Sequence, residues 1–211
     1  MTGVQTCALP ISITVDDVLS SRLISAPLHL LDCCIISDGG GAIVVTSTER
    51  AKDLRRKPVL ILGCGESVCH QEIGSPDLLT MGARQAGERA FGMAGVQRSD
   101  IDLAMVYDSF TITVLCTLEN LGFCEVGEGG DFVSGGRIGL GGALPVNLDG
   151  GGLSSNHPGM RGIFLAIEAT KQLRGECGDR QVAGAKLAVA HGTGGTLGVS
   201  HSGATLILGV E

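Results

Sequence analysis

His157 is the residue of this sequence whose surroundings most suggest chemistry. It stands within residues 147–162, where three glycines and two serines precede it and Pro158 follows it. Glycine admits backbone conformations closed to other residues, and proline disfavours a helical residue before it and can open the next helix. We therefore expect an imidazole held in a loop near a helix N-terminus, where an anionic oxygen would be stabilised. The alternative is a loop histidine that bonds only to backbone.

Two further groups of polar residues follow apolar runs that we expect to be strands. Tyr107 and Asp108 follow residues 103–106, and His191 follows residues 186–190. Sites in open α/β sheets form beyond the C-terminal ends of the strands. Because imidazole titrates near neutral pH, His191 could carry protons, and Tyr107 could donate to an oxyanion. The alternatives are a turn between two strands for His191 and a capping aromatic for Tyr107.

Alternating strands and helices must position these groups. The helical spacing of apolar residues predicts helices over residues 79–95 and 110–121 and after His157, with a short charged helix at 49–57. Residues 127–142 predict a glycine-rich connector with one short helix. Apolar runs predict strands at residues 42–46, 59–62, 103–106, 144–148, 186–190 and 204–208. Strands that are apolar on both faces indicate an α/β fold with a mixed β-sheet covered by helices on both faces.

Composition excludes several classes of protein. The 211 residues are 44% hydrophobic but only 3% aromatic, with no tryptophan, so the core must be aliphatic. The net charge of −7 argues against binding nucleic acid or an anionic membrane surface. The sequence has no uninterrupted apolar run near the roughly 20 residues that a membrane-spanning helix needs.

The eight cysteines do not have the spacing of a metal site. The sequence has no Cys-x-x-Cys pair, and Cys33 and Cys34 are adjacent. Cys64, Cys116 and Cys177 lie in or beside apolar segments, as Cys124 does. We therefore expect reduced, buried thiols in a cytoplasmic protein and no metal.

The first residues differ in character from the rest. Residues 1–11 resemble a translated sequencing adapter and lack the basic start of a secretory signal. We expect residues 1–12 to be a non-native segment, and the chain to be the C-terminal remainder of a protein that begins upstream.

Taken together, these motifs resemble those of the thiolase family, close to its sterol-carrier and lipid-transfer branch. Thiolases carry an Asn-Glu-Ala-Phe motif, a Gly-His-Pro motif and a C-terminal Cys-x-Gly motif. The first resembles the four residues from Tyr107 to Phe110, where the sterol-carrier branch has His-Asp-Cys-Phe. The second resembles Asn156-His157-Pro158, and the third resembles the run that begins at His191, with histidine in place of cysteine.

The resemblance implies a thiolase-like fold with two parts. Residues 13–56 would be the end of the thiolase N-terminal domain, and residues 57–211 would be its C-terminal domain. The family's nucleophilic cysteine would lie upstream, since neither Cys33 nor Cys34 stands in its motif. The full-length protein would be a homodimer or a larger assembly, and the chain alone would be inactive.

As its leading implication, the resemblance gives an acyltransferase that acts on 3-ketoacyl-CoA, with coenzyme A or acyl-CoA as substrate and no permanently bound cofactor. His157 would activate the missing thiol and donate to the thioester oxygen, while His191 and Tyr107 would handle protons. The residues expected to bind substrate are Asp108, Asn156, Gly192, Gly194 and Gly195.

Two alternatives remain open. One is a thiolase-like lyase that cleaves a branched or steroid-like acyl-CoA by a retro-aldol reaction. The other is a protein that binds lipid or acyl-CoA without catalysis. Relatives of the lipid-transfer type often work with a small zinc-ribbon and OB-fold protein, so the resemblance also implies such a partner.

Overall fold

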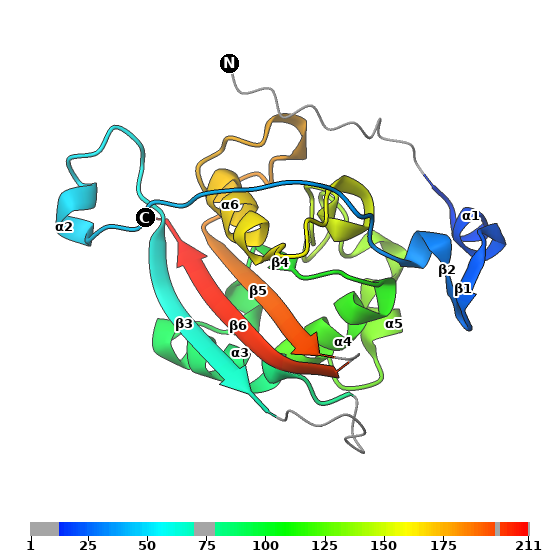
Figure 1. The fold of residues 1–211 in the computed structure, drawn as a ribbon. Helices are drawn as coiled ribbons and strands as arrows, with labels where there is room; N and C mark the ends of the chain where they lie inside the picture. The colour runs from blue at the N-terminus through cyan, green and yellow to red at the C-terminus, as the bar shows by residue number, and fades with distance from the viewer. Residues whose placement is uncertain (1–12, 70–78, 197–198, 211) are drawn as a thin grey trace.

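The computed structural model describes residues 13–69, 79–196 and 199–210. Its main body is a four-stranded sheet in the order β3-β6-β5-β4 (Figure 1). Strand β5 is parallel to β4 and antiparallel to β6, which is in turn antiparallel to β3. The expected α/β class with a mixed sheet is confirmed. The strands span Leu60–Val68 (β3), Leu103–Val106 (β4), Leu187–Thr196 (β5) and Val199–Gly209 (β6).

Helices cover the two faces of this sheet. Alternate residues of a strand point to opposite faces, so Leu103 and Met105 of β4 pack in the cluster that includes α6, and Ala104 and Val106 pack in the cluster that includes α3 and α4. All four residues are fully buried. The expected long helices are therefore confirmed. They span Gly82–Ala94 (α3), Thr111–Leu121 (α4) and Gly162–Leu173 (α6).

Shorter elements surround the main body. Residues 13–32 form a small unit beside the sheet (Figure 1), and residues 33–47 then run across α6 without regular structure. The expected helix at 49–57 is only four residues long, and the connector at 127–142 has its one short α-helix as predicted. These elements are Val15–Ser20 (α1), Leu23–Ser25 (β1), Leu28–His29 (β2), Thr48–Ala51 (α2) and Gly129–Val133 (α5).

The strand expected at residues 42–46 is wrong. The segment carries no strand pairing, and its apolar side chains are exposed, with Val44 at 89% and Val45 at 72% of full accessibility. A β-branched apolar run forms a strand only where another strand offers its backbone groups. Among the described residues this run has no such neighbour.

Three other strand boundaries differ from the prediction. Residues 144–148 form no strand, and only Val146 makes an isolated bridge, to Ala104. Strand β3 has nine residues instead of four, and it is only partly buried because it is the edge of the sheet. Strand β5 continues past Ala190 to Thr196, because β6 pairs with it along that length.

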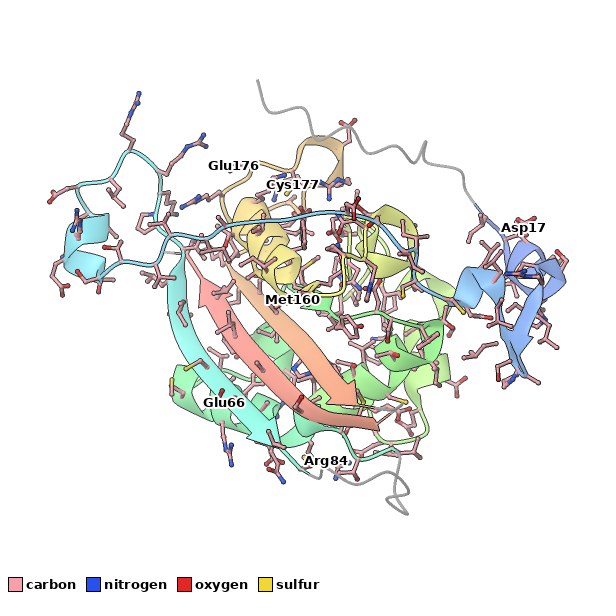
Figure 2. The ribbon with its side chains drawn as sticks, viewed as in Figure 1. Asp17, Glu66, Arg84, Met160, Glu176 and Cys177 are labelled. Carbon is pink, nitrogen blue, oxygen red and sulfur yellow. The ribbon has the colours of Figure 1, made fainter. Side chains whose placement is uncertain are left out.

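The cysteines differ in burial more than expected. All seven within the described residues are free thiols; Cys177 is buried near the end of α6, whereas Cys64 on the edge strand is exposed (Figure 2). The expectation of buried thiols is therefore wrong for Cys64. In the described part of the chain, no helix combines the length and apolar character needed to cross a membrane. The domain boundary expected near residue 57 stays a prediction.

Candidate active site

Tyr107 and His157 form the centre of the candidate site. Tyr107 directly follows β4, and its backbone N–H donates to the carbonyl of His191 at 2.9 Å, which fixes it to the end of the sheet. Its hydroxyl lies 2.9 Å from His157 Nε2, and the two ring centroids are 5.3 Å apart. A phenol and an imidazole at this distance share a hydrogen bond, so a proton can pass between them. Two of the three expected stretches are thus brought together.

The loop before α6 folds back onto Asp108. The N–H of Gly152 donates to Asp108 Oδ1 at 2.7 Å, and that of Leu153 donates to Oδ2 at 3.3 Å. Only glycine fits here: a Cβ on Gly151, whose φ is +63°, would lie 1.9 Å from Asp108 Oδ2, and a Cβ on Gly152 would lie 2.8 Å from the His157 ring. The glycine triplet therefore lets the loop pack closely enough to bring His157 to Tyr107.

The extended segment after residue 33 joins both halves of the site. Cys34 donates its N–H to the carbonyl of Ser109 at 2.9 Å, and Ile35 donates to the carbonyl of Gly152 at 3.0 Å. The backbone N–H of His157 donates to Ser37 Oγ at 2.9 Å. One segment thus holds the strand that carries Tyr107 and the loop that carries His157.

A buried arginine completes the loop's support. Arg161 is 1% exposed and donates through Nη1 to the carbonyl and side-chain oxygens of Asn156, and through Nη2 to Asp149. Its Nε lies 3.8 Å from Asp108 Oδ1. Burial raises the pKa of Asp108, and the N–H of Gly152 and the charge of Arg161 partly oppose that rise.

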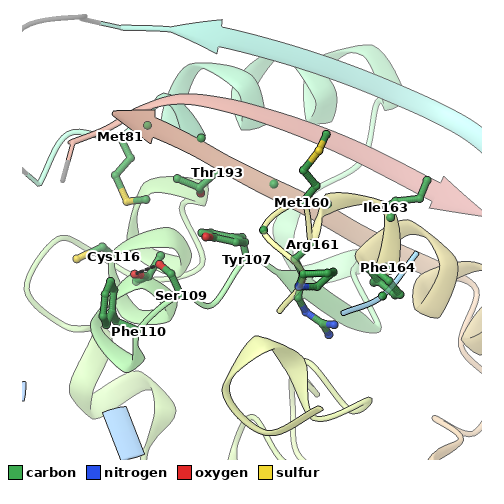
Figure 3. Close-up of a pocket in the computed structure, with 18 of the residues that line it drawn as sticks. Met81, Tyr107, Ser109, Phe110, Cys116, Met160, Arg161, Ile163, Phe164 and Thr193 are labelled. Atoms are coloured by element: carbon green, nitrogen blue, oxygen red, sulfur yellow. Dashed lines mark hydrogen bonds between the residues drawn. The ribbon is translucent and has the colours of Figure 1, made fainter. Parts of the chain in front are cut away.

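The candidate site opens into a cleft of about 1130 Å³. Tyr107 forms part of its wall, and apolar side chains from α4 and α6 line much of the rest (Figure 3). Three residues expected to bind substrate, Gly192, Gly194 and Gly195, also line it. His157 is not among the lining residues. The phenol therefore faces the cleft, and the imidazole supports it from behind.

His191 differs from the prediction. The expected strand end is wrong, because His191 lies inside β5 and is fully buried. Its Nδ1 and Nε2 share hydrogen bonds with the hydroxyls of Thr205 (2.8 Å) and Thr193 (3.1 Å). Its side chain does not line the cleft, although Thr193 does. Burial lowers the pKa of His191 from 6.5 to about 4, so the imidazole is neutral at physiological pH.

The polar atoms of Asp108 and Asn156, both expected to bind substrate, are used within the protein. Asp108 accepts from the loop's N–H groups, and Asn156 accepts from Arg161. Neither residue lines the cleft. Both are therefore placed to hold the loop in shape.

Sequence reasoning missed Arg161, Asp149 and Ser37. Arg161 was visible as a lone cation among small and apolar residues just after His157. A charged residue in such a setting suggests a buried ion pair. Its partners could not be found from spacing alone, because they depend on how the loop folds back onto β4.

Tyr107 is expected to titrate above the usual range of a tyrosine. Burial raises the pKa of its phenol, since the phenolate would lose hydration, while Ser109 partly opposes that effect. Tyr107 is the only tyrosine of the 211-residue chain, and tryptophan is absent. A near-ultraviolet absorbance titration therefore reports this one residue. A midpoint at or below about 10, the ordinary value, would contradict the buried placement of the phenol.

Comparison with known proteins gives the chain a family setting. Residues 65–210 match the family model described as "Thiolase C-terminal domain-like". The chain is 42% identical to a steroid side-chain-cleaving aldolase of Thermomonospora curvata, over 94% of this chain and 50% of that protein. It is 38% identical to an acetyl-CoA acetyltransferase of Methanothermobacter thermautotrophicus, over 90% of this chain and 51% of that protein. The chain thus spans about half the length of these relatives.

A solved structure agrees in fold. The chain superposes on the Ltp2-ChsH2(DUF35) aldolase with a TM-score of 0.84 and 40% identity, covering 94% of this chain and 51% of that one. The resemblance inferred from the three motifs is therefore confirmed.

Proposed function

Because this chain belongs to the thiolase family, we propose that it is the C-terminal half of an enzyme that breaks or forms a carbon–carbon bond beside a coenzyme A thioester. The observation that carries the proposal is the 2.9 Å contact between Tyr107 and His157 at the wall of the cleft. Acyl-CoA would be the substrate, and the reaction would need no permanently bound cofactor.

Within that class, the site favours a lyase over the acyltransferase that the sequence favoured. The family's first motif has an amide where this chain has the phenol of Tyr107. An amide can only hold an oxyanion, whereas a phenol paired with an imidazole can also accept and return a proton. A retro-aldol cleavage needs that proton transfer and needs no acyl-enzyme. Two similar proteins carry aldolase in their names or titles.

In the proposed reaction the substrate is an acyl-CoA with a hydroxyl on its β-carbon. The hydroxyl proton passes to Tyr107 Oη as the Tyr107 proton passes to His157 Nε2. The bond between the α- and β-carbons breaks, so that the β-carbon becomes a ketone or aldehyde and the α-carbon becomes the enolate of the thioester. The proton then returns through the pair to the α-carbon and releases a shorter acyl-CoA.

Acyl transfer is the second candidate, and its support is the 38% identity to an acetyl-CoA acetyltransferase. In that reaction a cysteine thiolate upstream of this chain would attack the thioester, and His157 would activate it. Free coenzyme A would then be consumed, which a retro-aldol cleavage does not require.

We also propose that the full-length protein works as a homodimer or larger assembly with a partner. The similar aldolase structure is titled as an Ltp2-ChsH2(DUF35) assembly. On this basis the partner would be a small zinc-ribbon and OB-fold protein, as the family resemblance implied.

The test is product analysis with the full-length protein, alone and with its partner. A β-hydroxyacyl-CoA with a branched β-carbon should yield a ketone and a shorter acyl-CoA without added coenzyme A. A 3-ketoacyl-CoA should be cleaved slowly even when coenzyme A is present. Cleavage of only the 3-ketoacyl-CoA, with one coenzyme A consumed per turnover, would replace the lyase with the acyltransferase.

A further inference from the structure

Arg161 joins three parts of the site through one buried cation. It donates to Asp149 at the start of the loop and to Asn156 at its end, and Asn156 directly precedes His157. Its Nε is also 3.8 Å from Asp108, the residue after Tyr107. The guanidinium therefore lies between the segment that carries the imidazole and the segment that carries the phenol.

We propose that Arg161 is the positioning residue that holds His157 against Tyr107. This role rests on the proposed function only where turnover is concerned, because the contact itself is a property of the fold. Figure 3 shows the Arg161 guanidinium pointing away from Tyr107 and toward the loop. Its Nη atoms are engaged by protein oxygens. Arg161 acts through the loop, and does not touch the reacting atoms.

The shape of the guanidinium matters as well as its charge. Arginine presents several N–H donors in a rigid plane, so it can bond Asn156 and Asp149 at once, whereas lysine offers a single point charge. Without a cation here, the carboxylates of Asp108 and Asp149 would face each other across a site that excludes water. Their repulsion would push the loop away from β4 and lengthen the contact between His157 and Tyr107.

The sole tyrosine of the chain gives a test that is independent of turnover. Tyr107 fluorescence should change in a step as pH crosses the range where histidine titrates, because an imidazolium and an imidazole quench a bonded phenol differently. His157→Ala should remove this step and so assigns it. Arg161→Met should reduce the step toward the level of His157→Ala, and Arg161→Lys should restore it in part.

Arg98 supplies a matched control. It also donates to a backbone carbonyl, that of Leu121, and stacks on Phe91, but it lies outside the candidate site. Arg98→Met should leave the fluorescence step unchanged. If Arg161→Met does not fold, as circular dichroism would reveal, Arg161→Lys decides, because it keeps the charge and loses the fork. A full-sized step in a folded Arg161 variant would overturn the proposal.

Turnover of the full-length protein provides the second measurement. Arg161→Lys should lower kcat by about 10-fold to 100-fold with little change in KM, because a misplacement of about 1 Å can reduce a rate by roughly 100-fold. A reduced fluorescence step together with unchanged turnover would keep Arg161 as the support of the contact and reject the contact's proposed role. An unchanged step with lower turnover would reject the positioning role.

Discussion

Tyr107→Phe should lower the turnover of the full-length protein by roughly 10²-fold to 10⁴-fold, the usual contribution of a general acid or base. The change removes only the hydroxyl that bonds His157 Nε2 and faces the cleft. The ring can keep its place beside β4, so the free energy of unfolding should change by only about 1 kcal/mol, the usual net value of one hydrogen bond. The measurement is kcat with the β-hydroxyacyl-CoA, alongside urea unfolding.

A double substitution makes this test sharper. If the phenol and imidazole act as one proton relay, His157→Ala should cost about as much as Tyr107→Phe, and the double variant should cost no more than either alone. Thr117→Val is a suitable control, because it removes a buried hydroxyl that has no hydrogen-bond partner among the described residues. Near-normal turnover in Tyr107→Phe, or additive losses in the double variant, would contradict the relay.

The elements that support this pair were largely predictable from the sequence. The apolar spacing in α3, α4 and α6 reflects packing on a single helix face, which depends only on neighbours along the chain. The position of Tyr107 and Asp108 after β4 followed from the strand before them. The approach of His157 to Tyr107 was predictable because both follow strands of one sheet.

The remaining features depend on contacts between distant segments. Residues 42–46 have the composition of a strand, but pairing depends on a partner that composition does not reveal. The buried group of Arg161, Asp149 and Asp108 depends on a loop folding back onto β4. The glycine-rich run after His191 suggested a turn, since glycine is common there. It is instead part of a strand, because β6 pairs with it over its length.

This difference in the position of His191 leads to the second large effect, which concerns stability and not turnover. His191 is buried as a neutral imidazole between two threonine hydroxyls, and its pKa falls from 6.5 to about 4. Below about pH 6.5 the unfolded chain therefore binds a proton that the folded chain does not accept until about pH 4. The stability is complete above that window and is lost as the pH falls through it.

His191→Gln should remove most of this acid sensitivity. Each unit of pKa shift corresponds to about 1.4 kcal/mol, so lowering the pH from about 6.5 to about 4 should cost the unsubstituted protein about 3 kcal/mol of unfolding free energy through His191. Glutamine keeps a polar group near Thr205 and Thr193 but does not titrate. Asp17 and Asp32 have lowered pKa values, so their losses on acidification fall below 3.8, outside this window.

Urea unfolding at steps across that pH window would measure the slope for each variant. His29→Gln is the matched control, because His29 is a half-buried histidine outside the main sheet, and it should retain the slope of the unsubstituted protein. The same slope in His191→Gln would mean that another group causes the acid sensitivity. A histidine that must stay neutral to remain folded is poorly suited to carry protons during turnover. Loss of the slope in His191→Gln, with turnover at neutral pH largely kept, would therefore separate the role of His191 in the sheet from that of His157 at the cleft.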